Sequence, residues 1–144
     1  MTTYRFACWT LAIFAAGFFA GQLFEDGTTA NAQGRKVFEL RTYTAPEGKL
    51  TALVDRFRED TVRIFERHGM ENVGYWVPQD APASGNTLIY ILAHESREAA
   101  AKSWDGFRQD PEWARISAES QADGPIVSGI QAVYMEATDF SAIQ

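Results

Sequence analysis

The stretch KVFELRTYT, from Lys36 to Thr44, is the part of the sequence that decides the expected fold. Every second side chain is apolar or small: Phe38, Leu40 and Thr42. The side chains between them are polar or amphipathic: Glu39, Arg41 and Tyr43. This alternation is typical of a strand with two different faces. A polar face normally lies in water, so the question is whether this one faces solvent or an enclosed space.

The remainder of the chain continues the pattern with helices and further strands. Pro46 and Gly48 end the first strand, and a helix is predicted from about Glu47 to His68, with Gly69 as its left-handed stop. Its apolar stripe is formed by Leu50, Leu53, Val54, Phe57, Ile64, Phe65 and His68. The charged residues, Arg56 among them, are expected on the opposite, solvent side.

Two more strands, a helix in two pieces and a last strand are predicted after Gly69. The strands span residues 70–77, 87–94 and 128–138, with a loop over 79–86. Ser96 is a suitable N-cap for a helix over 97–107. The sequence QDPEW then restarts the helix, with Asp110 as the cap and Pro111 at the first helical position. Gly74 indicates a bulge in the second strand.

The order strand, helix, strand, strand, helix, strand predicts an α+β ferredoxin-like βαββαβ fold with a four-stranded antiparallel sheet. The third strand, TLIYILAH, is apolar nearly throughout, which is typical of a central strand covered on both faces. We assign this domain to residues 37–140 and a short linker to residues 33–36.

Residues 1–32 are predicted to be separate from the domain. Arg5 precedes an apolar run over residues 6–21 that is shorter than the roughly 20 residues of a membrane span. The sequence Ala30-Asn31-Ala32 then supplies a cleavage site of the secretory type. We therefore expect an exported protein, periplasmic or secreted. The alternative is an uncleaved N-terminal anchor formed by residues 6–21, and in both cases the domain lies outside the cytoplasm.

Composition excludes several classes of function. The net charge of −6 argues against nucleic acid, whose phosphates would repel an acidic surface. The single cysteine, Cys8, precedes the domain, so the domain is expected to have no disulfide, thiolate metal site or cysteine nucleophile. No Gly-x-Ser-x-Gly elbow and no phosphate-binding glycine loop occurs.

Two motifs together resemble the NIPSNAP family: FELRTYT leading to PEGKL, and WDGFRQDPEW in the second helical segment. The resemblance covers about Val37 to Phe140. It implies a dimeric α+β barrel, in which the sheets of two subunits pair face to face with the helices outside. The larger barrel group includes monooxygenases and haem-handling proteins, whereas NIPSNAP members mostly lack a defined reaction. The resemblance thus implies a homodimer through the sheet face and leaves the activity open.

In such a barrel we expect the helices to cover Phe38 and Leu40, together with Ile89, Ile91 and Ala93 of the third strand. The opposite set would then point into the barrel: Glu39, Arg41, Tyr43, Leu88, Tyr90, Leu92 and His94. Tyr75 or Trp76 would close the resulting pocket. The candidate ligand-binding residues are therefore Glu39, Arg41, Tyr43, Tyr75, Tyr90 and His94.

Glu39 and Arg41 lie two apart on one strand face, which allows them to pair. One interpretation is a buried ion pair that fixes the strand register. The other makes Arg41 the group that binds a carboxylate or enolate, with Glu39 as base or as the group orienting Arg41. Arg41, Glu39 and His94 are accordingly the candidate catalytic residues.

The two histidines are separated in sequence and lack metal-site spacing, so no metal centre is expected. We interpret His68 as stabilising a helix C-terminus. His94, at a strand end, is either a hydrogen-bonded edge residue or an acid/base group or haem ligand. No cofactor is expected otherwise. Trp104, Phe107 and Trp113 are interpreted as core residues.

Three functional interpretations remain open. The first is an exported dimer that binds a small, partly apolar molecule in a pocket between sheet and helices. The second is an enzyme of the barrel group, either a cofactor-independent monooxygenase or a haem-handling protein. The third is a non-catalytic structural or interaction module. We favour the first.

Overall fold

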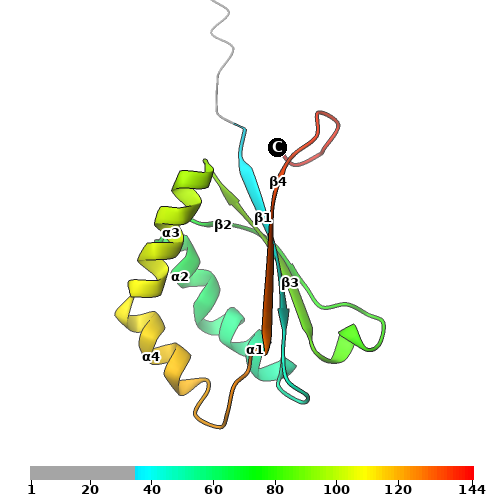
Figure 1. The fold of residues 1–144 in the computed structure, drawn as a ribbon, viewed down its shortest axis with the longest axis vertical. Helices are drawn as coiled ribbons and strands as arrows, with labels where there is room; N and C mark the ends of the chain where they lie inside the picture. Colours follow the sequence, from blue (N-terminus) through cyan, green and yellow to red (C-terminus); the bar gives the residue numbers. More distant parts are fainter. Residues whose placement is uncertain (1–34) are drawn as a thin grey trace, which may run out of the picture. The chain divides into compact units, whose positions relative to one another are not determined.

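The computed structural model describes residues 35–144, and the predicted signal or anchor segment lies outside them. The described part is a four-stranded antiparallel sheet with the order β2-β3-β1-β4 and helices on one side of it (Figure 1). The strands are β1 (Val37–Thr44), β2 (Glu71–Trp76), β3 (Thr87–His94) and β4 (Gly129–Glu136). The predicted α+β ferredoxin-like topology is confirmed.

The first helical segment is continuous from residue 50 to residue 67 but changes its winding in the middle. It comprises α1 (Leu50–Arg56), a π-helical turn η1 (Phe57–Thr61) and α2 (Val62–Arg67). It begins three residues later than predicted, and Gly69 follows it with a φ of 77°, as expected for a left-handed stop.

The second helical segment is divided where the sequence predicts. The Ser96 hydroxyl accepts a hydrogen bond from the Ala99 amide at the start of α3 (Arg97–Gln109). The Asp110 carboxylate accepts from the amides of Glu112 and Trp113 at the start of α4 (Pro111–Glu119). Among residues 35–144, no helix is long and apolar enough to cross a membrane.

The two faces of the sheet are the reverse of our prediction. Glu39, Arg41 and Tyr43 face the helices, as do their neighbours on β3: Leu88, Tyr90, Leu92 and His94. The set expected against the helices, Phe38, Leu40, Ile89, Ile91 and Ala93, lies on the other side. Alternation separates two faces but does not say which one the helices cover. Here the helices supply partners for the polar side chains, so these are buried at low cost.

The core lies between the sheet and the helices and is rich in aromatic rings. Tyr90 is at its centre, with ring centroids 5.1 Å from Phe57, 5.3 Å from Tyr43 and 5.4 Å from Tyr75. Trp104 and Phe107 of α3 are buried in the same cluster, and Trp113 of α4 packs against it, as the sequence predicted. Each such buried side chain stabilises the fold by about 1.5–3 kcal/mol.

The opposite face of the sheet, which we call the open face, has no α-helix of the described part of the chain on it; only the short 3-10 helix η2 (Ala83–Gly85) of the β2–β3 loop is drawn on that side (Figure 1). The register places these side chains on it: Phe38, Leu40, Trp76, Ile89, Ile91, Val133 and Met135. The side chain of Val133 is 55% exposed and that of Trp76 is 51% exposed. Gly74, at the predicted bulge, lies under the Trp76 indole, because a Cβ at Gly74 would lie 2.6 Å from that ring.

Candidate functional site

The predicted pair Glu39–Arg41 is part of a buried polar cluster on the helix-facing side of the sheet. One carboxylate oxygen of Glu39 accepts a hydrogen bond from Arg41 at 2.6 Å. The other oxygen accepts from the Trp104 indole at 2.7 Å and lies 3.1 Å from Nε2 of His94. The Arg41 guanidinium also stacks on Trp104, 4.2 Å from its ring centroid. Strands β1 and β3 and helix α3 thus converge on one carboxylate.

The electrostatics of this cluster favour a permanently ionised pair. Burial alone would raise the pKa of Glu39, but hydrogen bonds from His94, Trp104 and Arg41 outweigh it, and the pKa is lowered. Burial alone would lower the pKa of Arg41, but the neighbouring phenols of Tyr43 and Tyr90 and the Glu39 carboxylate raise it. Because both Glu39 oxygens have donors, this geometry supports the interpretation of the pair as a structural ion pair.

His94 is enclosed by residues of its own chain. Its side chain is fully buried, its Nε2 faces Glu39, and its Nδ1 has no hydrogen-bond partner among the described residues. It does not line the cavity described below. The geometry therefore does not fit an axial ligand of haem at this position, which needs an open space next to the imidazole.

The tyrosines expected to bind a ligand are brought together, but mainly as part of the core. Tyr75 stacks on Tyr90 with an interplanar angle of 19°, and its hydroxyl donates to Asn72. The Tyr90 hydroxyl is buried and has no partner among the described residues. Burial raises the pKa of both phenols, so they stay neutral. Of the predicted set, only Tyr43 lines the cavity described next.

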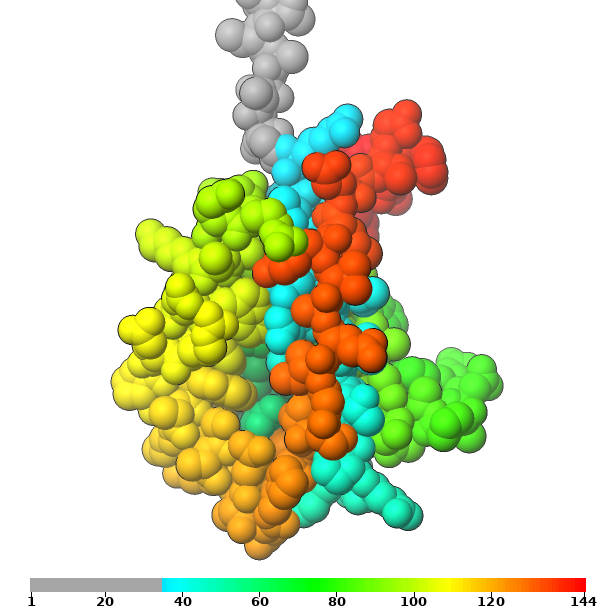
Figure 2. Space-filling model, viewed as in Figure 1, coloured from blue at the N-terminus to red at the C-terminus, as the bar shows by residue number. Residues whose placement is uncertain are grey.

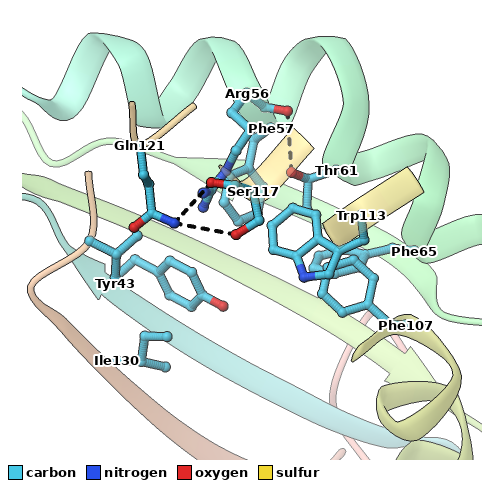
Figure 3. A pocket seen from close by; sticks show the side chains of 11 residues that line it. Tyr43, Arg56, Phe57, Thr61, Phe65, Phe107, Trp113, Ser117, Gln121 and Ile130 are labelled. Atoms are coloured by element: carbon cyan, nitrogen blue, oxygen red, sulfur yellow. Dashed lines mark hydrogen bonds between the residues drawn. The ribbon is translucent and has the colours of Figure 1, made fainter. Parts of the chain in front are cut away.

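That cavity, which we call the Arg56 cavity, lies between the sheet and the helices and has a volume of about 160 Å³ (Figure 3). Its walls come from every layer of the fold: Tyr43, Arg56, Phe57, Thr61, Phe65, Phe107, Trp113, Ser117, Gln121, Val127 and Ile130. Aromatic rings form much of the wall, and a few polar groups interrupt them, which is typical of small-molecule sites. In Figure 2 a hollow lies between α4 and β4, with atoms of the first helical segment visible inside it.

Arg56 is the residue that sequence reasoning missed. It was assigned to the solvent side of the helix, but it is only 7% exposed. Its guanidinium lies 5.0 Å from the centroid of the Trp113 ring and donates to the Ser120 hydroxyl at 3.3 Å. Its Nε has no partner within residues 35–144. Burial lowers the pKa of Arg56, and the phenols of Tyr43 and Tyr90 oppose this effect.

The π-helical turn η1 is next to Arg56 and explains part of the error. An i→i+5 turn inserts one residue into the helix and rotates the residues after the turn by about 100° relative to an ideal α-helix. The Thr61 hydroxyl donates to the Arg56 carbonyl at 3.2 Å, a bond that spans this turn. The available signal was position: Arg56 follows the buried Leu53 by three residues, and these two residues share a helix face.

The second family motif, DPEW, forms a structural junction. Asp110 accepts from Arg67 at 2.6 Å and lies 2.7 Å from Nε2 of His68, so it joins α2 to the α3–α4 boundary. Glu112 accepts from Arg63 and Arg67. His68 therefore has a specific carboxylate partner as well as its place at a helix C-terminus. Within residues 35–144, no cluster of three or more acidic, histidine or cysteine side chains could hold a metal ion.

Comparison with known proteins identifies the family. The NIPSNAP family model matches residues 38–142, which is most of the chain. The chain belongs to the NIPSNAP family. This NIPSNAP chain matches no curated protein significantly. Its fold is similar to that of a NIPSNAP family protein of unknown function from Agrobacterium tumefaciens, with a TM-score of 0.67 and 23% identity over 76% of this chain and 95% of that one.

Two further solved structures share the fold of this NIPSNAP protein. A NIPSNAP-like domain protein from Burkholderia xenovorans has a TM-score of 0.65 and 18% identity, over 74% of this chain and 89% of that one. SnoaB, a cofactor-independent oxygenase from Streptomyces nogalater, has a TM-score of 0.51 and 13% identity, over 75% of this chain and 98% of that one. At these identities the likeness concerns the fold alone.

Proposed function

We propose that this NIPSNAP protein is an exported homodimer that binds a small, partly apolar molecule between its sheet and its helices. The observation that carries the proposal is the Arg56 cavity, because aromatic side chains line a partly open space there that the core leaves unfilled. Protein interiors are otherwise close-packed. An engineered apolar cavity of about 150 Å³ binds benzene, so this space suits a single ring or a short chain.

The homodimer is supported by the open face. Apolar side chains of all four strands lie there, among them Leu40, Ile91 and Val133, and leaving them in water is unfavourable. A second copy of the same face would cover them, in an isologous pairing of two sheets. Export is supported by the sequence of residues 1–32, and mass spectrometry of the protein from its own host would show an N-terminus at Gln33.

The ligand proposal is tested by filling the cavity. The protein is purified from its host under native conditions, and the small molecules that it carries are identified by mass spectrometry. Ser117→Leu adds apolar bulk to the cavity wall, whereas Ala118→Leu adds it to the exposed side of α4. The copurifying molecule should be lost in Ser117→Leu and kept in Ala118→Leu. Equal retention in both variants would place the ligand elsewhere.

A second candidate function is cofactor-independent oxygenation. SnoaB is a cofactor-independent oxygenase with a similar fold, and the Arg56 cavity of this chain has the phenol of Tyr43 in its wall. A direct test measures consumption of O₂ with small dihydroxyarenes as substrates. Oxygenation predicts consumption that Ser117→Leu abolishes and Ala118→Leu preserves. Binding without catalysis predicts no consumption in any of the three proteins.

A further inference from the structure

We propose that the ligand of the Arg56 cavity is a small organic monocarboxylate, whose carboxylate pairs with Arg56 and whose apolar body lies against Phe57 and Trp113. This inference rests on the proposed function, since it names the chemical class of the molecule bound there. It assigns a binding role to Arg56, for which the sequence analysis had predicted a place in solvent.

The charge of Arg56 has no counterpart among the described residues of the subunit. Arg41, the other deeply placed arginine, has the Glu39 carboxylate at 2.6 Å. Arg56 has no acidic group within 4.0 Å in residues 35–144, and its one hydrogen-bond acceptor there is the neutral Ser120 hydroxyl. A buried charge without a partner is costly, and an incoming anion would remove that cost.

The direction of the guanidinium supports the same conclusion. Figure 3 shows Arg56 extending from the first helical segment toward Ser117, with Phe57 beside it, and Trp113 lines the same cavity. Nε is buried and has no partner in the described part of the chain. Because an arginine has five N–H donors in a planar fork, it can bind the two oxygens of a carboxylate side by side.

The remaining walls limit the ligand to a single negative charge and a compact body. Of the described residues, Arg56 is the only basic one that lines the Arg56 cavity, and the other side chains there with polar groups are Tyr43, Thr61, Trp113, Ser117 and Gln121. One arginine neutralises one negative charge, which favours a carboxylate over a phosphate dianion. The volume of about 160 Å³ accommodates a benzene-sized ring or a short aliphatic chain.

The hollow between α4 and β4 gives such a molecule a route into the site (Figure 2). Ile130, which lines the Arg56 cavity from β4, is 51% exposed, so it forms part of the entrance. The charged end would enter first and reach Arg56, and the apolar body would remain near the aromatic rings.

The test compares matched probes on the intact protein by isothermal titration calorimetry. Benzoate and hexanoate carry the carboxylate, benzamide is the neutral counterpart of benzoate, and inorganic phosphate is a different anion. We expect benzoate to bind about tenfold or more tightly than benzamide, which is the usual scale of a charge-assisted hydrogen bond. Arg56→Gln should remove this difference. Arg58→Gln, an exposed arginine on the same helical segment, should leave it unchanged.

The outcomes separate this inference from the proposed function. Equal binding of benzoate and benzamide would overturn the carboxylate while the apolar cavity remained a binding site. Phosphate binding as tight as that of benzoate would also overturn it. If no probe binds, the cavity is not a site of this kind and the proposed function fails with it. If Arg56→Gln does not fold, the benzoate-to-benzamide ratio of the wild-type protein decides the question.

Discussion

The carboxylate of Glu39 accepts a hydrogen bond of 2.7 Å from the indole of Trp104, which joins β1 to α3 across the core. This contact lies on the same face of the sheet as the apolar core, so hydrogen bonding and apolar burial together place the helices on that face. In this arrangement the side chains of Glu39, Arg41 and Tyr43 face the helices, and those of Phe38 and Leu40 lie on the open face. The polar face of β1 is thus covered by the helices of its own chain.

The first prediction concerns the stability of this buried pair. Glu39→Gln removes the charge that compensates Arg41, and breaking a buried ion pair costs about 3 kcal/mol or more. Urea denaturation should show that loss in the free energy of unfolding. Glu71→Gln, which breaks the exposed pair with Lys36, should cost less than about 1 kcal/mol. Similar losses in the two variants would show that the Glu39 cluster is not structural.

The second prediction is a loss of stability in acid. The pKa of Asp110 in the folded state is below its reference value of 3.8, chiefly because of the hydrogen bond with His68. Its contribution to stability is therefore complete above about pH 5 and is lost as the pH falls below the reference value toward the folded-state pKa. Asp110→Asn should be less stable at neutral pH and should lose less stability between pH 5 and pH 3 than the wild type. Asp105→Asn, which breaks an exposed ion pair with Arg108, should cost less than about 1 kcal/mol at neutral pH.

The third prediction concerns Gly106 on α3. A Cβ at this position would lie 2.8 Å from Nδ1 of His68, whose ring is held by Asp110. Alanine normally stabilises a helix interior by about 1 kcal/mol relative to glycine. In Gly106→Ala the clash with His68 should outweigh this stabilisation, so the melting temperature should fall. Gly85→Ala is the control, because nothing lies within 4 Å of its Cβ position. A melting temperature of Gly106→Ala above that of the wild type would contradict the packing of His68.

The fourth prediction tests the homodimer. Val133 and Ile130 lie on the same strand with similar exposure, 55% and 51%, but on opposite faces of the sheet. Val133→Asp places a charge on the open face and should yield a monomer in sedimentation velocity. Ile130→Asp should remain dimeric. A wild-type monomer, or dissociation of both variants alike, would contradict pairing through the open face.

The sequence was sufficient for the architecture but not for the orientation of the sheet. Caps at Ser96 and Asp110, the stop at Gly69 and the bulge at Gly74 are local signals, and each is confirmed. The side that the helices cover depends instead on contacts between residues far apart in the sequence, such as the hydrogen bond between Glu39 and Trp104, 65 residues apart, and the packing of the aromatic core. No local pattern contains that contact.

The burial of Arg56 had one signal in the sequence, its spacing of three residues from Leu53. The π-helical turn after Arg56 rotates the later residues, so a helical wheel drawn without this turn assigns Arg56 to the charged side. The tyrosines that the sequence did select were brought together, but only Tyr43 reaches the Arg56 cavity. Residue type and spacing therefore predicted one lining residue of the cavity, Tyr43. Its charged residue, Arg56, was identified only from the three-dimensional structure.

The most direct test of the central claim is a crystal structure of the protein grown with benzoate. The account predicts ligand density between the sheet and the helices, with the carboxylate at Arg56 and the ring beside Trp113. Density on the open face, against Leu40 and Ile91 between two paired sheets, would contradict it, and so would an Arg56 cavity that stays without ligand at saturating benzoate.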